Sequence, residues 1–295
     1  MPTDQLRIMV YRHSVFYSPL IAVVAAGFLE EEGLTATYFP KPPRRNQYEM
    51  FRNDEVDIMQ AAVSTSWDPL SKGDRDIPVH FAQINQRDGF FLMRRGSRDA
   101  FEWRDLEGTR VLADHAQQPF AMFKYGLHLK GVNLNRIELS NAGSPDAMEK
   151  AFRDGQADYI HLQGPAPQQL EKEGVGKVVA VMGEVIPPVA FSSLMARREF
   201  LRTAKAQAFM RAYRRSLRFV LESSARDIAT AEASFFPAIP VDVMEAAIAR
   251  YQQLGTWRLD PTITREQYDM AMDIFVHAGI FKERFPYEDV VVRFA

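Results

Sequence analysis

Short apolar segments alternate with longer helical stretches along the first two thirds of this chain, and this alternation is the strongest constraint on its fold. It is typical of α/β proteins with mainly parallel sheets. The last third has helical character almost throughout, over 200–223, 225–235, 241–253 and 264–278. The predicted strands fall into two blocks, with 6–11, 34–39, 56–61, 78–85 and 90–94 in the first, and 110–113, 137–140, 157–162 and 177–182 in the second.

Glycine and proline mark several of the predicted helix ends. Gly33 follows a helix predicted over 18–32, and glycine is favoured just after a helix C-terminus. Pro119 is suited to open a helix that runs to about residue 130, because proline is tolerated at the first helical position. Ser144 is a predicted N-cap. Helices are therefore expected between successive strands of both blocks.

One internal similarity relates the two blocks. The segment 51–58 reads Phe-Arg-Asn-Asp-Glu-Val-Asp-Ile, and 152–159 reads Phe-Arg-Asp-Gly-Gln-Ala-Asp-Tyr. In both, a predicted helix ends, a polar turn follows, and an aspartate precedes an apolar strand. Chance similarity between two helix–turn–strand junctions is one interpretation. Together with the strand pattern, the similarity supports two lobes of similar build.

Composition excludes several classes of site and partner. The formal net charge is −2, so neither nucleic acid nor an anionic membrane is expected as the main partner. The chain has 0 cysteines, which excludes disulfides, zinc–thiolate sites and cysteine nucleophiles. There is no phosphate-loop, dinucleotide-binding, nucleophile-elbow or His-Glu-x-x-His motif, and the 6 histidines are scattered. We therefore expect no cofactor and no metal.

The first apolar stretch, 20–29, is far shorter than the roughly 20 residues that a membrane-spanning helix needs. No charged segment, apolar segment and small-residue cleavage site follow one another as in a signal peptide. We expect a chain that does not span a membrane and that is cytoplasmic as written. A periplasmic location is the alternative if a signal peptide has been removed.

Candidate binding residues follow the predicted strands, because ligands of open α/β sheets bind beyond the carboxyl ends of the strands, where helix N-termini also point. These segments share hydroxyl, amide, imidazole, guanidinium and aromatic groups. Such groups suit a small polar or anionic molecule, with a ring for stacking. The first block supplies Arg12, His13, Ser14, Phe16, Tyr17, Ser64, Thr65, Ser66, Trp67, Arg87, Asp88 and Gly89, and the second supplies His115, Gln117, Gln118, His161, Gln163 and Gly164.

Each of these residue types also has an ordinary structural role. Serine and threonine at strand ends often cap helices, arginine often lies in a surface ion pair, and aromatic rings often belong to the core. The basic residues favour an anion, whereas Phe16, Tyr17 and Trp67 favour a flat ring. The identity of the ligand therefore stays open.

Four segments give the chain a resemblance to a known superfamily. They are 16–34, with small residues before Gly-Phe-Leu and a Gly-Leu ending, 53–58, with Asp-Ile entering a strand, 106–111, of the form Leu-x-Gly-x-x-Val, and 147–158, a helix–turn–aspartate junction. In order and spacing they resemble type II periplasmic solute-binding proteins. The similar branch binds nitrate, alkanesulfonates, taurine and thiamine-pyrimidine precursors, and includes thiamine-pyrimidine synthase-like proteins.

The resemblance implies a two-lobed periplasmic-binding-protein-like α/β fold with two hinge crossovers, near Leu92–Arg95 and near Val189–Leu194. Lobe one would hold 1–92 and 193–295, and lobe two 95–188. A small sulfonate, carboxylate or pyrimidine-like molecule would bind between the lobes, and hinge closure would bury it. The protein would then be the solute-binding component of an ABC importer, with the permease as its partner.

The alternative is a cytoplasmic enzyme on the same fold. His13, His115 or His161 would then carry out acid–base chemistry, because imidazole titrates near neutrality. Decarboxylation, dehydration and thiamine-pyrimidine synthesis are the candidate reactions. The fungal pyrimidine synthases and the desulfinase of this branch use cysteine, which this chain lacks. Both hypotheses need Arg12–Tyr17 and Ser64–Trp67 to face His115–Gln118 and His161–Gly164 across one crevice.

Overall fold

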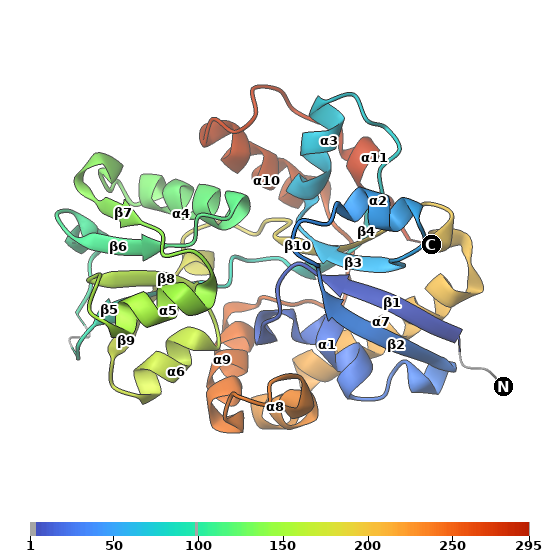
Figure 1. Ribbon diagram of the computed structural model, residues 1–295, viewed down its shortest axis with the longest axis horizontal. Helices are drawn as coiled ribbons and strands as arrows, with labels where there is room; N and C mark the ends of the chain where they lie inside the picture. Colours follow the sequence, from blue (N-terminus) through green and yellow to red (C-terminus); the bar gives the residue numbers. More distant parts are fainter. Residues whose placement is uncertain (1–3, 98–99, 295) are drawn as a thin grey trace.

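Two five-stranded sheets form the centre of the protein, as seen in a computed structural model that describes residues 4–97 and 100–294 (Figure 1). The first sheet has the order β2-β1-β3-β10-β4, with β1 Asp4–Val10, β2 Leu34–Pro40, β3 Ile58–Ala61, β4 Val79–Asn85 and β10 Ser192–Ala196. The second has the order β7-β6-β8-β5-β9, with β5 Phe90–Arg95, β6 Arg110–Ala113, β7 Glu138–Ser140, β8 Tyr159–Gln163 and β9 Gly176–Val181.

The two sheets are built alike. In each, one strand runs against the others: β10 is antiparallel to β3 and β4, and β5 is antiparallel to β8 and β9. The chain enters each of these reversed strands directly from the other sheet, and the reversed strand is the fourth in its sheet. The similar segments 51–58 and 152–159 lead into β3 and β8, which occupy the third place in their sheets. The predicted α/β fold with two similar halves is confirmed.

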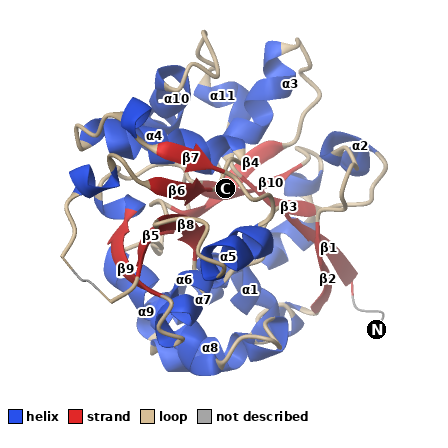
Figure 2. Cartoon of the chain, turned by 60° about the vertical axis from the view of Figure 1, so that its left-hand side comes forward, coloured by secondary structure: helices blue, strands red, loops and turns tan. Residues whose placement is uncertain are grey.

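Helices cover both sheets (Figure 2). We call the second sheet with its helices the second lobe; these are α4 Gln117–Leu129, α5 Pro145–Arg153 and α6 Ala166–Lys172. We call the first sheet with the other α-helices the first lobe. Its helices are α1 Ser18–Ala25, α2 Gln47–Arg52, α3 Trp67–Ser71, α7 Ala204–Glu222, α8 Ala225–Glu232, α9 Val241–Leu254, α10 Arg265–His277 and α11 Tyr287–Val290. The C-terminal helices join the lobes, because α9 contacts α6 and α10 contacts α4.

Two local features differ from the sequence predictions, and a third agrees with them. α1 ends at Ala25 instead of reaching residue 32, because Gly27 takes a left-handed φ of 78° and turns the chain. The segment 163–167 was expected as a loop, but α6 begins within it. Pro167 fits the first turn of α6, where no backbone N–H is needed. The capping role of Ser144 is confirmed, since its side chain accepts from Ala147 N.

The chain crosses between the sheets at 86–89 and again at 182–191. The first crossover was predicted near Leu92–Arg95, but these residues lie inside β5, where they pair with β8 and β9. The second was predicted near Val189–Leu194, and the end of that segment already belongs to β10. Tyr251 of α9 ties the first crossover in place, since its hydroxyl accepts from Gly164 N at 2.9 Å and donates to Gly89 O at 3.0 Å.

Gly89→Ala is expected to lower the free energy of unfolding by about 1–3 kcal/mol, the usual cost of overpacking a buried site. A Cβ at this crossover position would lie 2.1 Å from Cε2 of the buried Phe16 ring. Urea unfolding of the variant tests this. Phe16→Leu combined with Gly89→Ala is expected to cost less than the two single losses added together. An unchanged unfolding midpoint for Gly89→Ala would contradict the close packing at the crossover.

Candidate ligand-binding site

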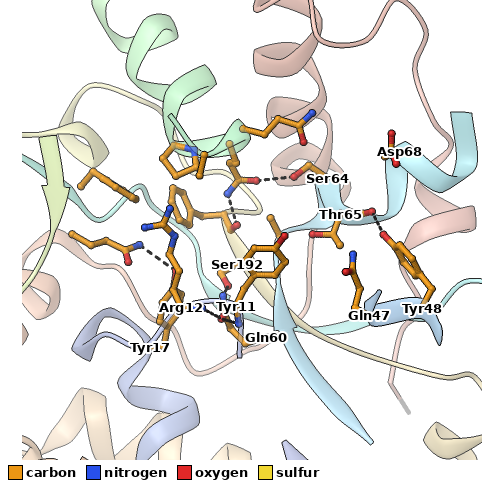
Figure 3. A pocket seen from close by; sticks show the side chains of 18 residues that line it. Tyr11, Arg12, Tyr17, Gln47, Tyr48, Gln60, Ser64, Thr65, Asp68 and Ser192 are labelled. Atoms are coloured by element: carbon orange, nitrogen blue, oxygen red, sulfur yellow. Dashed lines mark hydrogen bonds between the residues drawn. The ribbon is translucent and has the colours of Figure 1, made fainter. Parts of the chain in front are cut away.

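A cavity of about 420 Å³ lies between the lobes, beyond the carboxyl ends of β1, β3 and β8 (Figure 3). Small-molecule sites commonly have volumes in this range. The first lobe contributes Tyr11, Arg12, Tyr17, Gln47, Tyr48, Gln60, Ala62, Ser64, Thr65, Asp68 and Ser192. The second lobe and the second crossover contribute Phe90, Ala116, Gln117, Gln118, Pro119, Gln163 and Phe191.

Direct contacts join the two walls of the cavity. The segments 12–17 and 64–67 of the first lobe meet 114–118 and 163–164 of the second lobe. The contacts are an ion pair from Arg12 Nη2 to Asp114 Oδ2 at 2.7 Å, and hydrogen bonds from Ser64 Oγ to Gln118 Oε1 at 3.2 Å, from Gln163 Nε2 to the Tyr17 hydroxyl at 3.2 Å, and from Ser14 Oγ to Gly164 O at 2.5 Å. The structure is therefore in a closed arrangement.

Gln60 organises the first-lobe wall from the interior of β3. Its Oε1 accepts from the backbone N–H groups of Tyr11 and Arg12, at 2.9 and 3.2 Å. Its Nε2 donates to Ser192 Oγ at 2.9 Å. One buried amide thus holds the segment after β1 against the start of β10. Gln60 was not predicted, because the candidate residues were those that follow the strands, although a glutamine inside an apolar strand was a usable signal.

The segment after β3 forms one side of the cavity with α2. The Tyr48 hydroxyl donates to Thr65 O at 2.5 Å (Figure 3). Burial raises the pKa of Tyr48 to about 12, so its phenol stays protonated at neutral pH. Gln47 and Tyr48 were not predicted, because they lie at the start of a helix that begins several residues after a strand.

Seven of the predicted binding residues line the cavity, four from the first lobe and three from the second. They are Arg12, Tyr17, Ser64, Thr65, Gln117, Gln118 and Gln163. Contact between these side chains and a ligand stays a prediction.

Most of the other predicted binding residues lie in packed positions outside the lining. Trp67 is 0% exposed, and its indole Nε1 donates to the Tyr268 hydroxyl at 2.9 Å. Ser66 Oγ lies 3.2 Å from His80 Nε2. Phe16 is buried against Phe191, Tyr251 and Tyr17. Trp67, Ser66 and Phe16 pack behind the cavity wall and do not line the cavity.

The remaining non-histidine candidates lie at the crossover and at the contact between the lobes. Arg87 donates to Gly183 O at 2.9 Å. Asp88 Oδ1 accepts from Phe90 N at 2.8 Å, and burial raises the pKa of Asp88 to about 7. Ser14 and Gly164 bond to each other, and Gly89 accepts from Tyr251. All five therefore shape the junction between the lobes.

None of the three candidate catalytic histidines lines the cavity. His13 stacks on Phe236 at 4.3 Å, and its Nε2 lies 2.8 Å from Phe235 O. The ring of His115 packs against Phe120, and its Nδ1 lies 2.9 Å from Ala113 O. His161 is fully buried between Phe90 and Phe123. Burial, with a smaller contribution from the Arg12 charge, lowers the pKa of His161 to about 3, so this ring is neutral at neutral pH.

The charges at the cavity are paired. Among the described residues that line it, Arg12 is the one cation and Asp68 the one carboxylate. Arg12 pairs with Asp114, and Asp68 lies 2.7 Å from Lys72 Nζ. The other polar lining groups are uncharged hydroxyls and amides, the amides being those of Gln47, Gln60, Gln117, Gln118 and Gln163. Such groups both donate and accept hydrogen bonds.

Within residues 4–97 and 100–294, no three histidine, aspartate or glutamate side chains are grouped as a metal site requires. Over the same ranges, no helix is both long enough and apolar enough to cross a lipid bilayer.

Comparisons with known proteins agree with this architecture. The chain is 27% identical over 291 residues to the putative binding protein YtlA of Bacillus subtilis (strain 168), covering 97% of this chain and 87% of that one. The structure is similar to the ligand-binding component of an ABC-type import system from Staphylococcus aureus, with a TM-score of 0.77, 16% identity and coverage of 98% and 97%. It is also similar to the periplasmic aliphatic sulphonate binding protein SsuA from Escherichia coli, with a TM-score of 0.74, 15% identity and coverage of 99% and 93%.

A family model described as NMT1/THI5 like matches residues 16–226, which is most of the chain. The match includes the segment after β3, both crossovers and the whole second lobe. The chain therefore belongs to the NMT1/THI5-like family.

Proposed function

We propose that this protein binds a small polar organic molecule in the cavity between its lobes, as the solute-binding component of an ABC importer. The observation that carries the proposal is a cavity of about 420 Å³ whose walls come from both lobes and meet through direct contacts. A ligand that touches both walls stabilises the closed arrangement over an open one, and the permease would recognise the closed form.

The relatives support this proposal through their descriptions. One similar structure is described as the ligand-binding component of an ABC-type import system, and YtlA as a putative binding protein. The same proposal gives this chain a permease as partner and a place of action in the periplasm, where the sulphonate-binding relative is found. The enzyme hypothesis depended on histidines in the cleft. We do not propose it, because His13, His115 and His161 lie away from the lining.

Gln117→Ala and Gln163→Ala are each expected to weaken ligand binding about 3- to 10-fold, because each removes a neutral hydrogen-bonding group worth about 0.5–1.5 kcal/mol. The ligand is first selected by thermal shift from a panel of sulfonates, carboxylates, carboxamides and pyrimidines, and its affinity is then measured by calorimetry. Gln156→Ala, an exposed glutamine outside the cavity, is the matched control and is expected to bind as the wild type does.

Two outcomes would count against the proposal. One is a wild-type protein that no compound of the panel stabilises and that carries no small molecule in native mass spectrometry. The other is a ligand whose affinity is the same in Gln117→Ala, Gln163→Ala and the control.

A further inference from the structure

Two equivalent strands, one in each lobe, are followed by opposite charges that face each other. β1 and β6 occupy the same place in their sheets, second from one edge, beside β2 and β7 respectively. Arg12 lies two residues beyond the carboxyl end of β1, and Asp114 lies one residue beyond that of β6. Their side chains meet across the cavity at 2.7 Å. The Arg12 side chain is 22% exposed and the Asp114 side chain 8%, so both are largely withdrawn from water.

Both partners are fixed from their own side. The backbone N–H of Arg12 donates to Gln60, and its guanidinium lies 5.7 Å from the centre of the Phe90 ring. Asp114 Oδ1 accepts from Ala116 N at 2.8 Å, which leaves Oδ2 to Arg12. The pair is therefore a built feature of the closed cleft, unlike an ion pair between two mobile surface side chains.

The pair neutralises the cation that an anionic ligand would need. A sulfonate or carboxylate that approached Arg12 would meet the Asp114 carboxylate on the same guanidinium. Like charges at such distances repel strongly where water is largely excluded. Apart from Asp68, the remaining polar lining groups are amides and hydroxyls, which offer a neutral ligand both donors and acceptors.

We propose that Asp114 determines the charge of the ligand: by holding Arg12 across the cleft, it excludes anions and selects an uncharged polar molecule. This inference rests on the proposed binding function and adds a charge class to it. Asp114 acts through Arg12 and is therefore a specificity-determining residue that need not touch the ligand.

Asp114→Asn tests the inference, because the amide keeps the acceptor for Ala116 N and removes the negative charge beside Arg12. Matched probes are ethanesulfonate with ethanesulfonamide, and benzoate with benzamide, each an anion paired with its neutral analogue. For the wild type we expect the neutral members to bind more tightly. For D114N we expect at least a 10-fold gain in affinity for the anions, which fades as the salt concentration is raised.

Two further variants test whether the gain in anion binding comes from freeing Arg12. Asp68→Asn removes the carboxylate that lines the cavity, but Asp68 pairs with Lys72 and not with Arg12. It is expected to give no gain in anion binding. Adding Arg12→Gln to D114N is expected to abolish the gain, because the freed cation is then gone.

Failure of this inference differs from failure of the proposed function. A wild type that binds ethanesulfonate or benzoate more tightly than the neutral analogue overturns the charge selection, and so does a folded D114N that gains no anion binding. In both cases the binding function still stands if a neutral compound of the panel binds the wild type. The wild-type comparison alone decides the matter if D114N does not fold.

Discussion

Replacing Trp67 with alanine is expected to lower the free energy of unfolding by about 3–5 kcal/mol, the usual cost of deleting a fully buried tryptophan ring. The ring is 0% exposed and lies edge-on to Phe275, Tyr268 and Phe281, with centroid distances of 5.0, 5.8 and 6.0 Å. Its indole N–H donates to the Tyr268 hydroxyl, which in turn donates to Phe285 O. Alanine leaves a void and removes the donor to that hydroxyl.

Chemical denaturation followed by circular dichroism measures this loss. Trp67→Phe keeps a ring and loses the hydrogen bond, so a smaller loss of about 1–2 kcal/mol is expected. Trp103→Ala, at a half-buried tryptophan of the second lobe, is the comparison for ring deletion and is expected to cost less than Trp67→Ala. If Trp67→Ala kept the stability of the wild type and lost ligand affinity, Trp67 would belong to the binding surface after all.

Glu232→Gln is expected to remove a strong pH dependence of stability. Glu232 of α8 is 0% exposed, and burial raises its pKa from 4.5 to about 8. The folded protein therefore holds a proton on this group that the unfolded chain releases above about pH 4.5. The contribution of Glu232 to stability is therefore greatest at low pH and falls by about 1.4 kcal/mol per pH unit between those two pKa values.

The hydrogen bonds around Glu232 agree with a protonated carboxyl. Ser18 Oγ lies 2.7 Å from Val15 O and 3.0 Å from Glu232 Oε2. A hydroxyl has one hydrogen, and Ser18 donates it to Val15 O, which can only accept. The hydrogen bond between Ser18 Oγ and Glu232 therefore needs the carboxyl O–H as its donor.

The measurement is the difference in unfolding free energy between the wild type and Glu232→Gln at several values from pH 5 to 8. The wild type is expected to lose about 3–4 kcal/mol relative to the variant over this range. Glu222→Gln, at an exposed glutamate of the neighbouring helix α7, is the control, and its difference from the wild type should stay constant. A constant difference for Glu232→Gln would show that the carboxyl is ionised in the folded protein.

The fold was largely predictable, because it follows from local patterns that the chain repeats. The alternation of apolar strands and helices gave both blocks, and the similar segments 51–58 and 152–159 lead into the equivalent strands β3 and β8. The position of the first crossover was harder to predict. Residues 90–93 are apolar whichever sheet they join, and only the pairing of β5 with β8 and β9 shows which sheet it is.

The cavity was predicted as a set of segments, but not residue by residue. After β3 the chain turns through a short helix, Val63–Ser66, into α3. Ser64, Thr65 and Asp68 line the cavity, while Trp67 is buried in the core. Ser64 and Trp67 are three residues apart, so a helical period alone does not separate these two faces. The alternation of side chains along β3 does not identify Gln60 as a site residue. Its role depends on hydrogen bonds to Tyr11, Arg12 and Ser192, which lie on other strands and loops.

A crystal structure of the protein loaded with the tightest ligand of the panel tests the central claim most directly. We predict density for the ligand between the two walls, in contact with Gln60 or Tyr17 of the first lobe and with Gln118 or Gln163 of the second. Density on an outer surface, or against one lobe alone, would contradict binding between the lobes.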